Sequence, residues 1–228
     1  MTTDYFGKSI EVHPDTGEIR GSFNESLQVH EPELIEEVIK ILKTIDRPVM
    51  FDVGACSGSY AMLDLVVDVE IYSVEPVSRS FDALQYNVKT NRSKTKCFNL
   101  GIMNYIGEGD LHEVTWTGGS ALSMINGIPS FSRKQNVTKK IEVTTIDELV
   151  KKVHRTPDLI KIDVEGAEWF ALDGAKETLK KKPFIILEWE DENLNQFKKG
   201  KGEILELLEG YEIRELKNNL ICSFNSTT

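Results

Sequence analysis

Residues 49–59, VMFDVGACSGS, hold the side chains and glycines from which a ligand site could be built. An apolar run leads to Asp52, and the glycines Gly54 and Gly58 follow with three residues between them. Glycine accepts unusual backbone dihedrals and lets a ligand approach the main chain. A buried strand that enters a tight glycine turn is how open α/β sheets bring backbone N–H groups close to a nucleotide. The stretch therefore predicts a ligand that carries a nucleoside.

A second acid lies at the distance that this interpretation requires. Glu75 ends the next apolar run and follows Gly54 by 21 residues. An acid about 20 residues beyond the glycine turn is where such folds bind ribose hydroxyls. We expect the cofactor to be held between Gly54 and Glu75.

The glycine spacing narrows the choice of cofactor. A dinucleotide fingerprint needs G-x-G-x-x-G to bind a pyrophosphate, whereas this chain has G-x-x-x-G with Asp52 two residues before it. An acid at that place would repel phosphates and would suit a cationic amino-acid group. S-adenosylmethionine carries an adenosine, an ammonium and a sulfonium, and no phosphate. The alternative is that the turn only connects a strand to a helix.

The densest group of acids lies in residues 159–168, LIKIDVEGAE. Asp163 ends an apolar strand, and Glu165 and Glu168 follow at short intervals. Acids at a helix start can simply cap the helix and favour its positive end. A carboxylate at the edge of a buried strand, however, is costly unless it has a donor, a cation or a metal. Asp163 is therefore the stronger functional candidate, and capping is the alternative for Glu168.

Alternating apolar patterns surround these acids and predict the elements that position them. We expect strands at residues 49–51, 70–74, 95–100, 159–163 and 184–189, and a terminal hairpin of residues 211–216 and 220–224. Helices are expected at residues 31–44, 59–67 and 78–89, after a capping box at residues 145–148, and around Ile204. This alternation predicts an α/β sandwich of three layers with a mostly parallel sheet. Ligands bind such sheets beyond the carboxyl ends of the strands, where the acids collect.

One segment breaks the alternation. Residues 102–140 contain strand-like pieces at 110–116 and 137–143 and a long stretch rich in Gly, Ser and Asn. A structureless loop of that length in a compact domain is usually functional or disordered. We interpret residues 117–135 as a mobile substrate loop within one domain of residues 31–228, preceded by an N-terminal arm of residues 1–30.

Composition excludes some partners. The 228 residues include 27 Lys and Arg against 37 Asp and Glu, a net charge of −10, which argues against a nucleic-acid partner. No apolar segment approaches 18 residues, so we expect no membrane insertion. Three widely spaced cysteines favour a reducing compartment, and together these features predict a cytoplasmic protein.

Four stretches resemble the FkbM-type S-adenosylmethionine-dependent methyltransferases: FDVGACSGSY, IYSVEP, VTTIDEL and LIKIDVEGAEWFALDGA. The likeness covers roughly residues 31–190, and IDVEGAE is its most specific part. It implies the class I methyltransferase fold, which is Rossmann-like with a seven-stranded sheet, and methylation of hydroxyl oxygens, often on sugars or other small acceptors. The implied cofactor contacts are Asp52, Gly54, Ala55, Cys56, Ser57, Gly58, Glu75, Pro76, Asn99, Leu100, Gly101 and Asp163. Cys56 departs from the family, which usually has Asn there.

Methyl transfer to a hydroxyl needs precise positioning and the removal of a proton. The candidate bases are Asp163, Glu165, Glu188 and His112. A second mechanism is open, because Mg²⁺ or Mn²⁺ bound by Asp163 and Glu188 could hold a sugar diol and lower the pKa of its hydroxyl.

Two other functions fit part of the pattern. A nucleotide-sugar enzyme that uses NAD shares the sheet and the acid after the second strand, but it would need the missing G-x-G-x-x-G motif. A non-catalytic cofactor-binding module would keep the fold alone. The acceptor, expected to be a small molecule or a glycan, and the oligomeric state are not determined by these residues.

Overall fold

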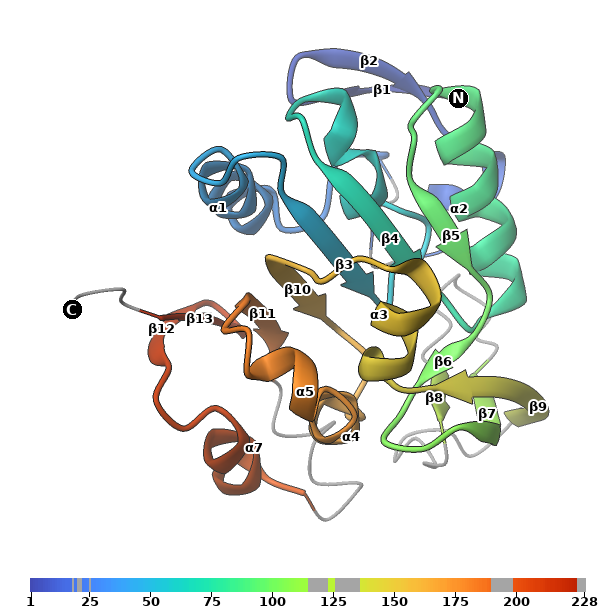
Figure 1. Ribbon diagram of the computed structural model, residues 1–228. Helices are drawn as coiled ribbons and strands as arrows, with labels where there is room; N and C mark the ends of the chain where they lie inside the picture. The colour runs from blue at the N-terminus through green and yellow to red at the C-terminus, as the bar shows by residue number, and fades with distance from the viewer. Residues whose placement is uncertain are drawn as a thin grey trace.

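The computed structural model describes residues 1–17, 19, 22–24, 26–114, 123–125, 136–189 and 199–224. Its centre is a seven-stranded sheet with helices on both faces (Figure 1). The strands lie in the order β12-β13-β11-β10-β3-β4-β5. Their bounds are β3 (Val49–Val53), β4 (Glu70–Val74), β5 (Lys96–Phe98), β10 (Leu159–Ile162), β11 (Phe184–Glu188), β12 (Glu212–Leu216) and β13 (Asn219–Ser223).

Strands β5, β4, β3, β10 and β11 are parallel, whereas β13 pairs antiparallel with both β11 and β12. The prediction of a mostly parallel seven-stranded sheet with an antiparallel terminal hairpin is therefore confirmed. β3 lies at the centre, and all five of its residues are buried because both faces of the sheet are covered. The chain reverses its direction of travel across the sheet next to β3, which creates a switch point there.

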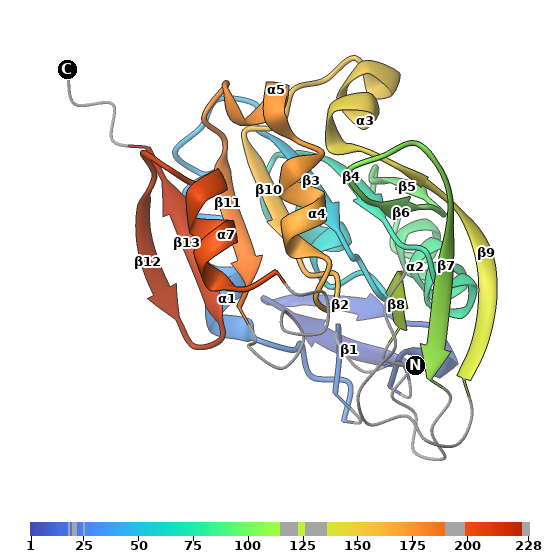
Figure 2. The same ribbon diagram turned by 90° about the horizontal axis from the view of Figure 1, so that it is seen from below.

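Two layers of helices complete the sandwich (Figure 2). One face carries α1 (Pro32–Leu42), α2 (Ser78–Thr90) and the short 3-10 helix η2 (Tyr60–Leu65). The other face carries α3 (Ile146–Val153), α4 (Glu168–Asp173), α5 (Lys176–Leu179) and α7 (Lys201–Leu207). Alternate residues of the central strands enter two separate cores. Phe51 packs in the core beneath α3 and α4, whereas Met50 packs in the core beneath α1.

Local sequence explains where several helices begin. Pro32 occupies the first turn of α1, where a missing N–H costs nothing. Thr145 caps α3, since its Oγ1 accepts a hydrogen bond from the N–H of Glu148 at 3.1 Å. Asp147 reaches from α3 to α5 and accepts from the N–H and hydroxyl of Thr178 at 2.8 and 2.6 Å. These contacts fix the start of α3 and hold α5 against it.

The helix expected at residues 59–67 is instead the 3-10 helix η2. The carbonyl oxygen of Ala61 accepts hydrogen bonds from the hydroxyls of Ser93 and Thr95, at 3.1 and 2.6 Å. That oxygen is the acceptor that an α-helix would offer to the N–H of Leu65. Tertiary contacts thus favour the tighter helix over the one that the sequence pattern predicts.

A second, smaller sheet stands beside β5 at one end of the main sheet (Figures 1 and 2). It has the order β6-β9-β7-β8, with β6 (Gly101–Ile102), β7 (Gly107–Val114), β8 (Ser123–Ile125) and β9 (Asn136–Thr144). The two strand-like pieces predicted here are β7 and β9, and their antiparallel pairing was not foreseen. The rest of the predicted substrate loop, residues 117–122 and 126–135, lies outside the described residues.

The N-terminal arm, residues 1–30, lies on the same side of the sheet as α1 and α2 (Figure 2). It contains the hairpin of β1 (Thr2–Tyr5) and β2 (Lys8–Glu11) and the 3-10 turn η1 (Pro14–Gly17). Tyr5, Ile10 and Phe23 are buried in the core under α1. The arm is therefore packed as part of the body. Within the described part of the chain, no helix has the length and apolarity needed to cross a bilayer.

Candidate active site at the carboxyl edge of the sheet

A pocket opens beyond the carboxyl ends of β3, β4 and β10, at the switch point. It collects seven of the predicted cofactor residues, including the predicted base Asp163, and also the predicted base Glu165. Its lining consists of Ser22, Val53, Gly54, Ala55, Cys56, Ser59, Val74, Glu75, Pro76, Val77, Ser80, Leu100, Ile102, Lys161, Asp163, Val164 and Glu165.

The glycines of the turn are required by the protein's own packing. Gly54 has φ of +84°, and a Cβ built on it would lie 1.7 Å from the carbonyl oxygen of Asp163. Gly58 has φ of +96°, and its Cβ would lie 2.6 Å from Leu84 of α2. A side chain at Gly54 would push apart the loops that follow β3 and β10. The sequence predicted that Gly54 lets a ligand approach the main chain. In the structure, the backbone carbonyl of Asp163 occupies the space beside Gly54.

Four of the five backbone N–H groups from Gly54 to Gly58 already have acceptors within the protein. Those of Gly54 and Ala55 donate to Val74 O at 3.0 Å, that of Cys56 to Glu75 Oε2 at 2.8 Å, and that of Gly58 to Ala55 O at 2.8 Å and to Ser22 Oγ at 3.0 Å. A phosphate site at a glycine turn needs such donors to be free and directed at the ligand. This turn therefore does not offer the donors that a pyrophosphate requires.

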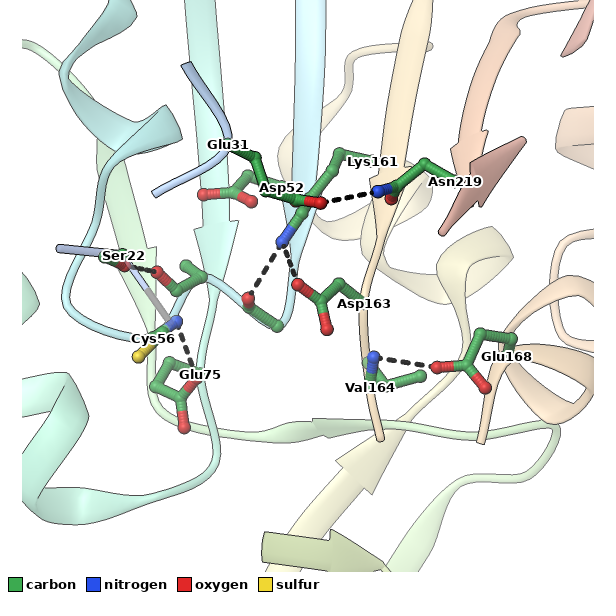
Figure 3. A network of polar contacts seen from close by, with 12 residues as sticks. Ser22, Glu31, Asp52, Cys56, Glu75, Lys161, Asp163, Val164, Glu168 and Asn219 are labelled. Atoms are coloured by element: carbon green, nitrogen blue, oxygen red, sulfur yellow. Dashed lines mark hydrogen bonds and ion pairs between the residues drawn. The ribbon is translucent and has the colours of Figure 1, made fainter. Parts of the chain in front are cut away.

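Glu75 lies at the wall of the pocket with only 5% of its surface exposed. One of its carboxylate oxygens accepts from the N–H of Cys56 at 2.8 Å (Figure 3). The other accepts from the N–H of Val77, also at 2.8 Å. Burial raises the pKa of Glu75 to about 7, against these hydrogen bonds, which lower it. The side-chain amide of Asn99 donates to the carbonyl oxygens of Glu75 and Pro76, at 2.8 and 3.2 Å. Asn99 thus fixes the turn that carries Glu75 and does not itself line the pocket.

Asp52 is completely buried and is not among the residues that line the pocket. Its Oδ2 accepts from the hydroxyl of Ser73 at 3.1 Å, and in strand register it lies beside Lys161. Burial raises the pKa of Asp52 to about 6, and the charge of Lys161 opposes that rise. Among the residues that the structure describes, nothing hydrogen-bonds its Oδ1. The geometry gives this acid a partner in Lys161 rather than in a ligand.

Lys161 is a buried cation that joins the two loops at the mouth of the pocket (Figure 3). Its Nζ lies 2.9 Å from Asp163 Oδ2 and 3.4 Å from the carbonyl oxygen of Gly54. It also stands over the ring of Tyr60, 5.0 Å from the centroid. Burial would lower the pKa of this ammonium, but the charges of Asp163 and Asp52 outweigh it and raise the pKa. Lys161 is therefore protonated at neutral pH and orients one oxygen of Asp163.

Glu168 holds the loop between β10 and α4. Its Oε1 accepts from the N–H groups of Val164 and Gly166, at 3.0 and 3.2 Å, and the residue is 99% buried. Burial raises its pKa to about 7. The loop includes Glu165, which has a positive φ of 56° and lines the pocket. Glu168 thus holds the loop that precedes α4 and does not cap the helix, whose N-cap residue Ala167 has no side-chain capping bond.

The structure does not bring two of the predicted bases into the pocket. His112 lies on β7 in the second sheet, with Nδ1 3.0 Å from the hydroxyl of Thr138. Glu188 ends β11 next to Asp163 and pairs in register with Asn219 of β13. No group of three or more His, Cys, Asp or Glu arranged for a metal ion is present among the described residues. The geometry therefore does not support the pair of Asp163 and Glu188 as a cation site.

Three further predicted contacts lie just outside the pocket. Ser57 is buried, and its carbonyl oxygen accepts from Asn87 of α2 at 2.8 Å. Gly58 faces Leu84, and Gly101 begins β6. These three residues belong to the turn and to β6 but do not line the pocket.

Comparison with known proteins agrees with this arrangement. The Methyltransferase FkbM domain matches residues 52–217, which is most of the chain. The chain belongs to the FkbM methyltransferase family. The class I methyltransferase fold that the sequence suggested is confirmed.

A curated relative of this FkbM methyltransferase is the 2-O-methyltransferase NoeI of Sinorhizobium fredii, 27% identical over 202 residues that span 82% of this chain and 79% of NoeI. A solved FkbM methyltransferase from Methylobacillus flagellatus is 18% identical, with a TM-score of 0.50 over 94% of this chain. This chain spans 48% of that one. A T. thermophilus 16S rRNA methyltransferase, solved with AdoMet and guanosine, has a TM-score of 0.51 at 11% identity, over 99% of this chain and 50% of its own. These two likenesses show the fold alone.

Sequence reasoning missed several lining residues of this FkbM methyltransferase. Lys161 carries a usable signal, because a lysine inside the apolar run LIKI stands at the position that pairs with Asp52 of β3. Val77 and Ser80 follow Glu75 closely and could have been inferred from its position. Ser22 has no such signal, since it lies 32 residues before the turn that it touches.

Proposed function

We propose that this methyltransferase transfers the methyl group of S-adenosylmethionine to a hydroxyl oxygen of a sugar, a glycan or a related small molecule. The observation that carries the proposal is the charge of the pocket. Glu75, Asp163 and Glu165 line it, while Lys161, the one cation among the described residues of the lining, is already bound to Asp163. A pocket with excess negative charge favours a sulfonium and an ammonium over a pyrophosphate.

The rest of the lining fits the same cofactor. Val74, Val77, Leu100 and Ile102 form an apolar wall on the side of Glu75, as a purine ring requires. The carboxylate of Glu75 can accept hydrogen bonds from ribose hydroxyls. When bound, S-adenosylmethionine supplies an activated methyl group.

The chain's part in the reaction is to position the acceptor and to take its proton. Lys161 holds one oxygen of Asp163, and the other points away from the ammonium (Figure 3). That free oxygen is our candidate to accept the hydroxyl proton, with Glu165 as the neighbouring alternative. Transfer to a hydroxyl oxygen is supported by the likeness to a 2-O-methyltransferase.

An enzyme that uses NAD is disfavoured by the same geometry. The N–H groups that a pyrophosphate needs are engaged within the turn, and a carboxylate stands beside them. Calorimetry should therefore show binding of S-adenosylmethionine and S-adenosylhomocysteine and no binding of NAD. If neither S-adenosyl compound binds, the proposal fails and a non-catalytic module becomes the better interpretation.

Turnover tests the base. Asp163→Asn keeps the shape of the side chain but removes its basicity, so we expect kcat to fall at least about 100-fold, as for loss of a general base. Binding of S-adenosylhomocysteine should change much less. Glu188→Gln is the matched control and should stay within a few fold of the parent, whereas Glu165→Gln tests the alternative. Full activity of Asp163→Asn would exclude Asp163 as the base.

A further inference from the structure

Ser22 of the N-terminal arm is inserted into the glycine turn. Its hydroxyl donates to the carbonyl oxygen of Ala55 at 3.3 Å (Figure 3). It also accepts from the N–H of Gly58 at 3.0 Å. The residue is 99% buried and lines the same pocket as Glu75. One side chain of the arm therefore bridges both ends of the turn.

Further contacts hold the arm against the turn from either side. Asn87 of α2 accepts from the N–H of His13 at 2.6 Å, and its amide donates to Thr16 Oγ1 at 3.2 Å and to the carbonyl oxygen of Ser57 at 2.8 Å. The hydroxyl of Tyr5 donates to the carbonyl oxygen of Ser59. The backbone carbonyls of Ala55, Ser57 and Ser59 are thus all tied to the arm or to the helix that carries it.

We infer that the N-terminal arm is part of the cofactor site and that Ser22 is a positioning residue for the glycine turn, an inference that rests on the proposed function. The arm lies wholly outside residues 52–217, the part of the chain that matches the family domain. Ser22 acts through the turn: with its hydroxyl in place, Ala55 and Cys56 are held where they line the pocket. Without it, the carbonyl of Ala55 loses a donor and the turn can relax.

This predicts a defect of binding rather than of folding. Ser22→Ala should weaken the binding of S-adenosylhomocysteine about tenfold, the effect expected for the loss of one or two hydrogen bonds. KM for the acceptor should be unchanged. The matched control is Thr3→Val, which removes the bond from Thr3 Oγ1 to Leu27 O, 2.7 Å long, within the same arm but away from the pocket. It should lower the thermal midpoint as much as Ser22→Ala does, with cofactor affinity unchanged.

Equal affinity of Ser22→Ala and the parent would overturn the inference. A second measurement needs no variant: hydrogen exchange of the parent protein should slow in peptides that cover residues 13–24 when S-adenosylhomocysteine is added. Unchanged exchange there, with binding shown by calorimetry, would overturn it as well. A parent protein that binds no S-adenosyl compound would instead contradict the proposed function.

Discussion

At the scale of single residues, Gly54 shows how one position can be fixed by a neighbouring backbone. Its φ of +84° needs a glycine, and so does its distance from the carbonyl of Asp163. Gly7, at the turn of the β1–β2 hairpin, has almost the same φ of +81° but nothing within 4 Å of the place where a Cβ would stand. Comparing Gly54 with Gly7 therefore separates the free-energy cost of a positive φ from the cost of a steric clash at Cβ.

Gly54→Ala should therefore destabilise the fold far more than Gly7→Ala. The dihedral alone costs about 1–2 kcal/mol, and we expect that figure for Gly7→Ala. At Gly54 the added methyl must also displace the β10 loop, so the loss should exceed about 4 kcal/mol, as for severe strain in a core. Urea unfolding of both variants measures the difference. Equal losses would mean that the two loops can separate freely.

At the scale of elements, three strands place a polar row inside an apolar sheet. Ser73 of β4, Asp52 of β3 and Lys161 of β10 lie side by side in register. The hydroxyl and the ammonium offset the buried carboxylate, and the ammonium extends the row to Asp163. A buried charge that loses its partner is strongly destabilising.

Lys161→Met should cost about 3–5 kcal/mol of stability at neutral pH, the usual loss when one partner of a buried pair is removed. Adding Asp52→Asn should restore part of it, because the remaining buried charge is neutralised, and a double-mutant cycle gives the coupling. Lys151→Met is the control: Lys151 is exposed and its partner Glu148 is partly exposed, so the change should stay within about 0.5 kcal/mol. An additive cycle would contradict the pairing of Lys161 with Asp52.

At the scale of the whole molecule, buried acids and a net charge of −10 act on stability together. Burial raises the pKa of Asp52 to about 6 and those of Glu75 and Glu168 to about 7, so the folded state binds these protons more tightly than the unfolded state does. Surface acids such as Glu37 have the opposite shift, because Lys40 donates a hydrogen bond to the carboxylate and lowers its pKa.

The protein without cofactor should consequently be most stable at about pH 4.5. From about pH 4.5 to 7 the three buried acids lose their protons and stability falls, at up to roughly 1.4 kcal/mol per pH unit for each. Below about pH 4.5, protonation of paired surface acids lowers it again. Thermal midpoints from pH 3.5 to 8 test this, and Glu168→Gln should flatten the upper slope. Greatest stability at pH 8 would contradict the shifts.

The sequence by itself determined the order and type of most elements and the edge where the site lies. Apolar runs that end in Asp52, Glu75 and Asp163 are local patterns, and parallel strands bring their carboxyl ends to one edge. The glycine turn and the IDVEGAE stretch were recognisable for the same reason. The prediction of the sheet, which is confirmed, and our proposal for the cofactor both rest on short segments.

Only the tertiary structure decided which acids face the pocket and what surrounds them. Asp52 turned out to lie beside Lys161 in strand register and to accept a hydrogen bond from Ser73, Glu168 to hold a loop, and Ser22 to close the turn. The neighbours of Asp52 and of Ser22 are distant in the sequence, and no local pattern records which partner satisfies a buried polar group. The free energy of burying a polar group depends on its neighbours in space, so the roles of these residues could be known only once the chain was folded.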